Sequence, residues 1–367
     1  MAFTLPAYTP PDFSQPAFRN RPLAAFAPAP TDGVAPDNYH GTTVFPEYFQ
    51  LAPGQWSLAP CSRMDCVTVR AADGTLAATE FRRLSQGDQV ALGRTENGEE
   101  GIYVHTTGFL APGQSAEKFG FRGNLTRETA FSIDYDQLYD LLDHERDHGR
   151  IIWVMGPAAV FDLDARNALC AIIKAGYVHG LLAGNALATH DIEGAIFGTA
   201  LGQELYRKNS VPLGHYKHLD ALNTVRRAGS IQAAMDAGHI TNGVMHALVT
   251  AGIPYVLAGS IRDDGPLPEV IANVYEAQSA MRALVREATT VIALATQLHT
   301  IATGNMTPSF TVAADKSVRP VYFYSVDMSE FAINKLADRG SLMARSILTN
   351  VQDFLVNLER NLRKRRA

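Results

Sequence analysis

Ile151-Ile152-Trp153-Val154-Met155-Gly156-Pro157-Ala158 is the stretch of the sequence that decides the fold. An unbroken apolar run that ends in a turn sequence predicts a strand covered on both faces, as in a parallel α/β sheet. Similar apolar runs occur at 180–183, 255–258, 290–294 and 321–326. Helical stretches such as 268–287 and 343–364 would cover these strands. We therefore expect residues 150–367 to form an α/β domain around a doubly wound parallel sheet, with ligands at the carboxyl ends of its strands.

The chain before residue 150 has a different character. Residues 1–36 hold eight of the nineteen prolines, which predicts an extended arm with little secondary structure. The aromatic side chains of this arm indicate that it packs against another surface, such as a neighbouring subunit. Residues 37–130 contain short β-branched pieces separated by turn sequences, which predict a small β-rich domain, either a sandwich or a barrel. Residues 131–149 are expected to form a connecting helix.

The composition limits the class of protein. A chain of 367 residues is long enough for two folded domains, and 46% hydrophobic with 19% charged residues is typical of a globular protein. The net charge of −5 argues against a partner such as nucleic acid or an anionic membrane, which would require a basic face. We interpret the basic tail at 363–366 as a solvated helix end whose cations suit the helix dipole.

The cysteines and the apolar runs bear on the compartment. Cys61, Cys66 and Cys170 include no C-x-x-C pair and favour free thiols in a reducing environment. No apolar run reaches the roughly 18 residues of a membrane span, and the N-terminus lacks the pattern of a secretion signal. We expect a cytoplasmic protein.

Each predicted strand of the sheet ends in small or polar residues. In chain order these are Gly156, then Gly184-Asn185-Ala186, then 259–266, then Thr296-Gln297-Leu298-His299, and finally Asp327. Small residues let the backbone approach a ligand, and helix N-termini that begin there offer free N–H groups to phosphates. One such cluster is ordinary in a βα loop, but five at consecutive strand ends indicate a shared ligand site.

The nucleotide interpretation lacks its usual motif. No two glycines are separated by a single residue, so the G-x-G-x-x-G fingerprint is absent, and the Walker A pattern is absent as well. A dinucleotide site would then depend on Asp327, whose carboxylate can accept hydrogen bonds from both hydroxyls of an adenosine ribose. A helix N-cap is an equal alternative for this residue.

Residues 180–191, Gly-Leu-Leu-Ala-Gly-Asn-Ala-Leu-Ala-Thr-His-Asp, resemble a signature of the LOR/SDH-region ornithine cyclodeaminases. This family also forms the C-terminal part of bifunctional arginine dihydrolase/ornithine cyclodeaminases. Further segments with the same resemblance are 38–43, 64–65, 214–216, 226–231, 256–268, 304–308 and 338–341. The resemblance extends from about residue 36 to about residue 355.

The resemblance implies a Rossmann-like domain that binds NAD and an enzyme that converts L-ornithine to L-proline with loss of ammonia. Oxidation and reduction then occur on one bound cofactor, without net redox change. Carried over by position, the cofactor contacts would be Asn185, Ala186, Asp264, Thr296, Gln297, Leu298, His299, Asp327, Asn350 and Val351. The small-residue loops add Gly156 and Gly184 to this set.

Three positions depart from the family pattern. Phe161-Asp162-Leu163 stands where the family continues toward His-Thr-Gly, and Thr296-Gln297-Leu298-His299 replaces a Met-Leu-His-Ser type of loop. Asn350 stands where Asp is common. The first departure is the largest and bears on the identity of the amino-acid substrate.

The chemistry requires a clamp for the substrate carboxylate and a base. Arg262 is our choice for the clamp, because a guanidinium presents two parallel donors, with an ion pair to Asp263 or Asp264 as the alternative. Asp263 and His190 are the candidates for the base. A solvated loop carboxylate is the alternative for Asp263, and a helix cap is the alternative for His190.

Polar residues of the β-rich domain are candidates for the substrate side. These are Asn38, Thr42, Thr43 and Asp65, for which ordinary turn polarity is the alternative. We expect no metal site, because His215 and His218 have a lysine between them and no carboxylate nearby.

Two other functions compete with the cyclodeaminase. One is an NAD-dependent dehydrogenase of a different amino or imino acid, of the saccharopine dehydrogenase type. The other is a non-catalytic NAD-binding sensor. For the enzyme we expect a small amino-acid substrate and a homo-oligomer.

Overall fold

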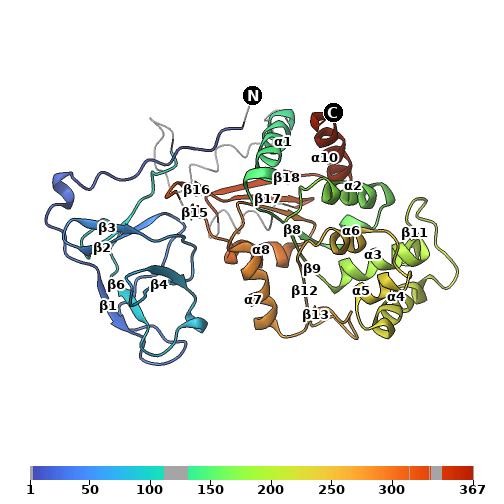
Figure 1. The fold of residues 1–367 in the computed structure, drawn as a ribbon, viewed down its shortest axis with the longest axis horizontal. Coiled ribbons are helices and arrows are strands. Elements are labelled where there is room, and N and C mark those ends of the chain that lie inside the picture. The colour runs from blue at the N-terminus through green and yellow to red at the C-terminus, as the bar shows by residue number, and fades with distance from the viewer. Residues whose placement is uncertain (1–2, 111–130, 314, 330, 332–340, 367) are drawn as a thin grey trace.

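A seven-stranded parallel sheet forms the centre of the computed structural model, which describes residues 3–110, 131–313, 315–329, 331 and 341–366. Its strands are β8 (Ile151–Met155), β9 (Gly180–Gly184), β12 (Tyr255–Ala258), β13 (Val270–Ile271), β14 (Thr290–Leu294), β17 (Tyr322–Asp327) and β18 (Met343–Leu348). The order across the sheet is β13-β12-β9-β8-β14-β17-β18 (Figure 1). Without the short edge strand β13, this is the 3-2-1-4-5-6 order of a Rossmann fold. The predicted doubly wound α/β architecture is confirmed.

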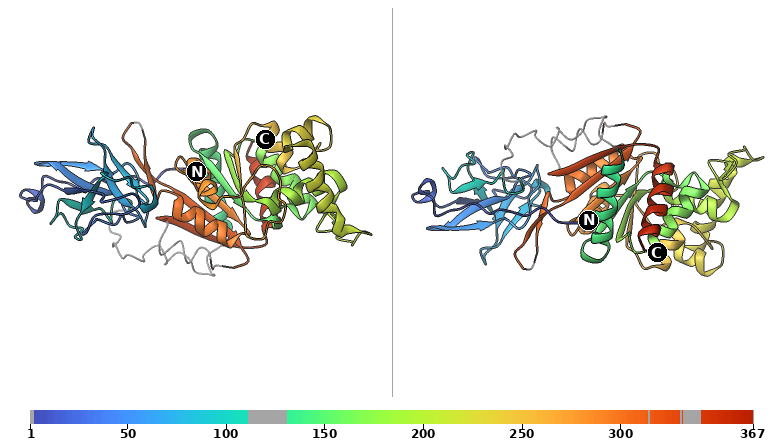
Figure 2. Two further views of the ribbon diagram at one scale, coloured as in Figure 1. Left: turned by 90° about the horizontal axis from the view of Figure 1, so that it is seen from below. Right: turned by 90° about the horizontal axis from the view of Figure 1, so that it is seen from above.

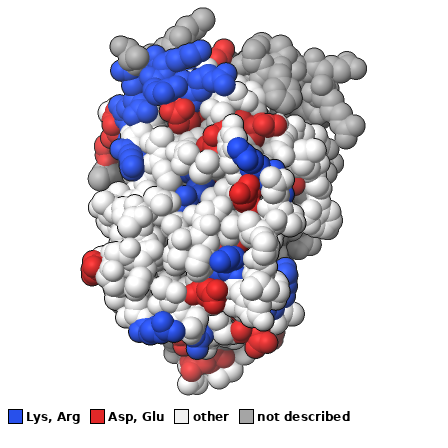
Figure 3. Space-filling view, turned by 90° about the vertical axis from the view of Figure 1, so that its right-hand side faces the viewer, with Lys and Arg blue, Asp and Glu red and all other residues white. Residues whose placement is uncertain are grey.

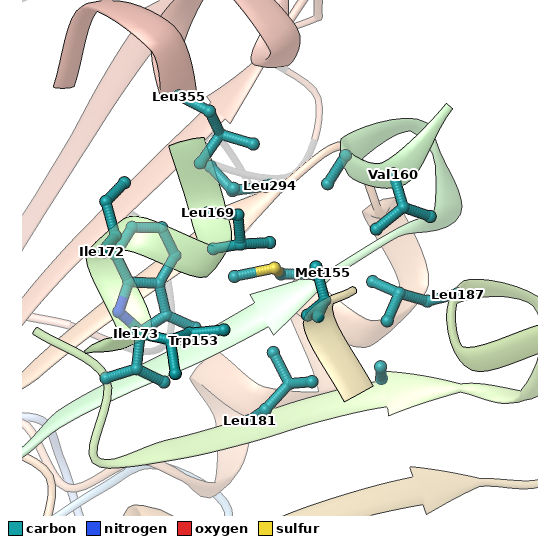
Figure 4. Packing of buried hydrophobic residues seen from close by; sticks show 14 of the residues in the cluster. Trp153, Met155, Val160, Leu169, Ile172, Ile173, Leu181, Leu187, Leu294 and Leu355 are labelled. Atoms are coloured by element: carbon teal, nitrogen blue, oxygen red, sulfur yellow. The ribbon is translucent and has the colours of Figure 1, made fainter. Parts of the chain in front are cut away.

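Helices cover both faces of this sheet (Figure 2). Alternate residues of β8 point to opposite faces, so that Trp153 belongs to one buried cluster and Val154 to the other. The Trp153 cluster is completed by α1 (Phe131–His148), α2 (Leu163–Lys174), α3 (Asn185–Phe197), α6 (Val244–Thr250) and α10 (Val351–Arg366). Leu169 and Ile172 of α2 and Leu355 of α10 belong to the same buried cluster as Trp153 and Met155 of β8 (Figure 4). The opposite face is covered by α7 (Val274–Val285) and α8 (Gln297–Met306).

The remaining elements of this domain lie beyond the carboxyl ends of the strands or at its edges. They are η4 (Pro157–Val160), β10 (Thr199–Ala200), β11 (Gln203–Glu204), α4 (Gly214–Ala228) and α5 (Ile231–Asp236). Figure 3 shows Lys and Arg gathered at the top of the domain's outer end, where the last turn of α10 carries residues 363–366. Arg365 pairs there with Asp140 and Asp143 of α1.

Two predicted helices begin later than the sequence indicated. Residues 343–348 of the predicted helix 343–364 are the edge strand β18, and α10 begins at Val351, where Asn350 accepts the N–H of Gln352 at 2.8 Å. Residues 270–271 of the predicted helix 268–287 pair with β12, and α7 begins after its cap Asn273. An edge strand is covered less than a central one, so β18 lacks the continuous apolar run by which we recognised the others.

The β-rich part consists of two antiparallel sheets that share a small core. One sheet has the order β1-β6-β4-β5 and the other β3-β2-β7. Their strands are β1 (Ala25–Pro28), β2 (Glu47–Ala52), β3 (Gln55–Leu58), β4 (Val67–Arg70), β5 (Leu76–Thr79), β6 (Gln89–Leu92) and β7 (Ile102–Val104), with the short helices η1 (Pro16–Phe18) and η2 (Phe81–Arg83). Phe49 and Ile102 of one sheet pack with Leu76 and Ala91 of the other. Residues 111–130 of the predicted domain lie outside the described residues.

The predicted arm is not wholly free of secondary structure. Strand β1, within residues 1–36, pairs along its whole length with β6. Phe13 stacks on Trp56 with ring centroids 4.7 Å apart, and Phe3 lies 5.4 Å from His144. The aromatic residues of the arm therefore pack on their own chain.

The two parts of the chain meet beside α7 and α8. Arg63 donates from Nη1 to the carbonyl of Asn305 in the last turn of α8 at 2.7 Å. Ser309 Oγ donates to the carbonyl of Ser62 at 2.9 Å, just before the hairpin of β15 (Phe310–Val312) and β16 (Val318–Pro320). Among the described helices, none is both long and apolar enough to cross a membrane.

Candidate active site

The carboxyl ends of the parallel strands lie at one edge of the sheet and bring the predicted loops together. A Cβ on Gly156, after β8, would stand 2.0 Å from the carbonyl oxygen of Ala295, after β14. A Cβ on Gly184, at the end of β9, would stand 3.3 Å from the ring of His299. The loops that follow β8, β9 and β14 are therefore in mutual contact, which only small residues permit.

Two helices at this edge begin without a side-chain cap. These are α3, whose N-cap is Gly184, and α8, whose N-cap is Thr296. Free N–H groups at a helix N-terminus favour an anion such as a phosphate. The open ends of α3 and α8 flank the end of β8, at the point where the strand order reverses.

Side chains close the N-termini of two further helices, α2 and α6. Asp162 caps α2 by accepting the N–H groups of Asp164 and Ala165 at 3.0 and 3.1 Å. Asp191 accepts the N–H groups of Val244 and Met245 at the start of α6. The departure from the family pattern at 161–163 therefore includes the residue that caps α2. Lys208 lies close to this cap, with its Nζ 3.3 Å from Asp162 Oδ2.

Asn185 connects the start of α3 to the loop after β12. Its Oδ1 accepts the N–H of Leu267 at 3.0 Å and the hydroxyl of Thr189 at 3.2 Å. Arg226 of α4 donates to the carbonyl of Pro266 at 2.9 Å in the same loop. Asn185 therefore positions the 259–267 loop, and Ala186 follows it in the first turn of α3.

Arg262 and Asp263 lie in this loop, on the solvent side. The Arg262 side chain is exposed, and among the residues that the structure describes no ion pair joins it to Asp263 or Asp264. Asp263 Oδ2 accepts the N–H of Ser260 at 2.9 Å and so closes its own turn. The exposed guanidinium of Arg262 is available to a ligand.

His299 is the partly buried member of the loop after β14. Burial lowers the pKa of its imidazole, and the negative charge of Asp263 opposes this shift. The ring is therefore neutral at physiological pH and lies within the electrostatic influence of Asp263. Gln297 and Leu298 are exposed beside it, at the open start of α8.

His190 lies on the second turn of α3 and has a different partner. Its Nδ1 is 2.9 Å from Oε2 of Glu193, which is fully buried. Burial raises the pKa of Glu193, but hydrogen bonds from His190, Thr199 and Gly202 outweigh it, so the pKa stays below its ordinary value. Because Glu193 is an anion, His190 Nδ1 donates to it, and in the neutral form of the ring Nε2 is then the acceptor. Phe161 packs against the His190 ring at 5.3 Å.

Asp327, Asn350 and Val351 lie at the ends of β17 and β18. Asp327 Oδ1 accepts the N–H of Ser329 at 3.3 Å. Asn350 caps α10, and Val351 is the buried first residue of that helix. Asn and Asp are about equally good N-caps, so this departure from the family pattern preserves the cap.

The strand order changes the interpretation of Asp327. In a Rossmann fold the acidic residue for the adenosine ribose follows the second strand, which is β9 here. Asn185 occupies that place, whereas Asp327 follows the fifth strand, in the other half of the sheet. Asp327 would therefore meet a ligand from the other half of the sheet, and its role in holding a ribose stays a prediction.

Two candidate substrate residues of the β-rich part, Thr42 and Thr43, lie near the junction of the two parts of the chain. Thr42 Oγ1 donates to the carbonyl of Arg63 at 2.6 Å, and Thr43 accepts the N–H of Phe45 at 3.1 Å. Arg63 contacts the last turn of α8, whereas the cofactor candidates occupy its first turn, about 15 Å away along a helix of 10 residues. Asn38 and Asp65 are exposed, with positive φ angles of 60° and 64°. The role of these four residues on the substrate side stays a prediction.

Glu193 was not identified from the sequence, whereas Gly259 belongs to the small-residue loop 259–266 that the sequence indicates. Glu193 orients His190, and Gly259 permits the backbone of residue 271 to approach, because a Cβ there would stand 2.8 Å from the Ile271 carbonyl oxygen. The small residue after β12 was a signal for Gly259, but nothing local indicates the partner of His190. Asp338, Arg339 and Gly340, which carry part of the family resemblance, lie outside the described residues. In the described part of the chain, no group of three His, Cys, Asp or Glu residues is arranged to hold a metal ion.

Comparison with known proteins agrees with this architecture. Residues 137–358 match the model of the C-terminal Rossmann-fold domain of ArgZ-like arginine dihydrolases. An ornithine cyclodeaminase from Methanopyrus kandleri is 37% identical over 339 residues, which cover 92% of this chain and 78% of that protein. The crystal structure of a LOR/SDH protein from Methanococcus maripaludis has a TM-score of 0.83 at 33% identity and covers 94% of this chain and 100% of its own.

A third comparison includes ligands. The crystal structure of AgrE in ternary complex with ornithine and NAD+ has a TM-score of 0.59 at 31% identity, covering 95% of this chain and 47% of the AgrE chain. The extent of these matches and the Rossmann strand order agree: the chain belongs to the ornithine cyclodeaminase family, whose Rossmann-fold domain is also the C-terminal domain of ArgZ-like arginine dihydrolases.

Proposed function

We propose that this protein converts L-ornithine to L-proline and ammonia with a bound NAD. The observation that carries the proposal is the edge of the sheet where loops after β8, β9, β12 and β14 meet around two open helix N-termini. Relatives that align with more than nine tenths of this chain are named ornithine cyclodeaminases.

The chain's own residues fit a dinucleotide at this edge. The open N-termini of α3 and α8 suit its phosphates, and Gly156, Gly184 and Gly259 leave the room that a Cβ would fill. We assign the cofactor to Gly156, Gly184, Asn185, Ala186, Asp264, Thr296, Gln297, Leu298, His299, Asp327, Asn350 and Val351. When bound, NAD supplies the acceptor and donor of two electrons, so that the reaction needs no external reductant.

The protein's other tasks are to hold the amino acid and to move protons. Arg262 offers an unpaired guanidinium to the substrate carboxylate. Asp263 is our candidate base, and its neighbour His299 is a neutral imidazole that can relay a proton. His190 with its orienting Glu193 is the alternative base, since it presents Nε2 as an acceptor. The side-chain amine of ornithine closes the ring as the α-amino group leaves as ammonia.

The decisive experiment measures three products of one incubation with L-ornithine. We expect proline and ammonia in equal amounts, with no accumulation of NADH at any time. L-Ornithine deuterated at the α-carbon should give proline that retains deuterium at that carbon. NADH that rises in proportion to ammonia would instead establish the amino-acid dehydrogenase. Retained NAD without ammonia release from any amino acid would establish the sensor.

A pair of arginine variants tests the carboxylate clamp. Arg262→Gln should raise the KM for ornithine roughly tenfold or more, because a charged hydrogen bond is lost, and leave NAD affinity unchanged. Arg227→Gln removes the same charge from an exposed position in α4 and serves as the matched control. An equal KM in both variants would show that Arg262 does not bind the substrate carboxylate.

The proposal includes a homo-oligomer in the cytoplasm. Exposed apolar side chains around β11 and the start of α4 support the homo-oligomer. They are Leu201, Tyr206 and Leu213, which are 58%, 68% and 67% exposed. Analytical ultracentrifugation at several concentrations tests it, and a monomer at all of them would contradict it.

A further inference from the structure

Three arginines surround a single carboxylate where the two parts of the chain meet. Arg63 donates from Nη2 to Glu80 Oε1, and Arg282 Nε lies 2.7 Å from the same oxygen. Arg83 Nε lies 3.5 Å from Glu80 Oε2. We call Arg63, Glu80, Arg83 and Arg282 the arginine cluster.

The arginine cluster lies apart from the candidate active site. Arg63 and Glu80 come from the β-rich part, whereas Arg282 is in the last turn of α7. Arg63 also contacts Asn305 at the end of α8, at the opposite end of that helix from Thr296–His299. The cluster therefore joins the two parts of the chain at a place that the proposed reaction does not use.

The charges of the cluster do not balance. Among the described residues, Glu80 is the only carboxylate within ion-pair distance of these three guanidinium groups. Arg63 and Arg282 are 8% and 5% exposed, so water does little to screen their repulsion. Burial, together with the nearby charges of Arg63 and Arg83, lowers the pKa of Arg282 to about 10. A buried cation without a counter-ion is costly.

Arg282 has hydrogen-bonding capacity to spare. Its Nη1 is buried and has no partner in the described part of the chain. The buried thiol of Cys66 does not supply the missing negative charge, because burial raises its pKa and keeps it protonated. A guanidinium with a free N–H in a group of arginines is the arrangement that proteins use for oxyanions.

We propose that the arginine cluster is a binding site for a small oxyanion, either a carboxylate or a phosphate. The anion accepts hydrogen bonds from Arg282 Nη1 and from Arg83 and competes with Glu80 for the shared guanidinium groups. Since the ligands come from both parts of the chain, the bound anion strengthens their junction.

The test measures binding to the full chain by calorimetry at constant ionic strength, with inorganic phosphate and acetate as separate probes. Arg282→Gln should weaken binding of the preferred probe about tenfold or more, because a charge-assisted hydrogen bond is lost. Glu80→Gln should strengthen it by a similar factor, because the competing carboxylate is gone. Arg227→Gln on α4 is the control for the loss of one positive charge and should bind as the parent protein does.

The opposite effects of the two variants separate a site from a structural ion-pair network. In a purely structural network both substitutions weaken the junction, and neither creates affinity for an added anion. The proposal is overturned if neither probe binds the parent protein, or if Arg282→Gln and Glu80→Gln change the affinity in the same direction. The tighter probe identifies the class of ligand, carboxylate or phosphate.

Discussion

Gly156 illustrates how one residue controls the geometry of the candidate site. The end of β8 passes so close to the end of β14 that a methyl group would overlap the Ala295 carbonyl oxygen. Ala295 itself has a φ of 47°, so the facing backbone is already held in an uncommon conformation and has little room to retreat. This contact fixes the position of the loop after β8 relative to the loop after β14.

Gly156→Ala should therefore disrupt the site and the fold together. We expect a loss of about 3 kcal/mol in the free energy of unfolding, measured with urea, and a large loss of NAD affinity. Gly184→Ala is the matched control, because its Cβ would lie 3.3 Å from a side chain that can shift rather than 2.0 Å from backbone. Equal stability of the two variants would show that the approach at Gly156 is not limiting.

His299 predicts a pH dependence of stability. Its pKa in the folded protein lies below the unfolded value of about 6.5, so between the two values only the unfolded chain binds the proton. With respect to His299, the protein therefore has its full stability above about pH 6.5 and loses stability as the pH falls toward the folded pKa. His299→Gln should make the acid side of the stability curve less steep.

A variant of Asp263 tests whether its charge acts on the pKa of His299. Its charge raises the pKa of His299, so Asp263→Asn should lower this pKa further and extend the loss of stability to lower pH. NMR titration of the His299 ring in both proteins measures the shift directly. An unchanged pKa in Asp263→Asn would mean that the two side chains do not interact.

At the scale of elements, helix caps determine which ends stay open to a ligand. The caps of α2, α7 and α10 are Asp162, Asn273 and Asn350, residue types that the sequence alone can identify as caps. A family pattern does not distinguish a cap from a ligand, so the expected roles of Asp162 toward the substrate and of Asn350 toward the cofactor stay predictions. The open ends were harder to foresee, since Thr296 is a common capping residue that makes no cap here.

A buried ion pair fastens three helices behind the open end of α3. Arg166 of α2 donates from Nε to Asp191 of α3 at 2.6 Å, and Asp191 caps α6. Asp191→Ala should cost about 3–5 kcal/mol in the free energy of unfolding, because it leaves the Arg166 charge buried without its partner. Arg166→Met combined with Asp191→Asn should recover part of that loss, since the charge is removed and one acceptor for α6 remains. Urea denaturation of the parent, of Asp191→Ala and of the double variant measures this, and a double variant no more stable than Asp191→Ala would contradict it.

At the scale of the whole molecule, the sequence predicts the sheet well and the junction poorly. Continuous apolar runs locate β8, β9, β12, β14 and β17 because both faces of these strands are buried. Residues of loops such as 38–43 carry no local sign of which distant element they meet. The contact of Thr42 with Arg63 is a consequence of tertiary packing, so the sequence of this loop does not indicate it.

The pairing of β1 with β6 has a consequence for how the chain can be shortened. Ala25–Pro28 covers β6, a strand that pairs with β4 on its other side. A chain cut at residue 37, where the sequence suggests a domain boundary, would leave the N–H and C=O groups of β6 bare along one side. Such an edge is a template for other chains, so this shorter protein should self-associate and scatter light on storage. A chain cut at residue 22, which keeps Ala25–Pro28, should stay free of aggregates.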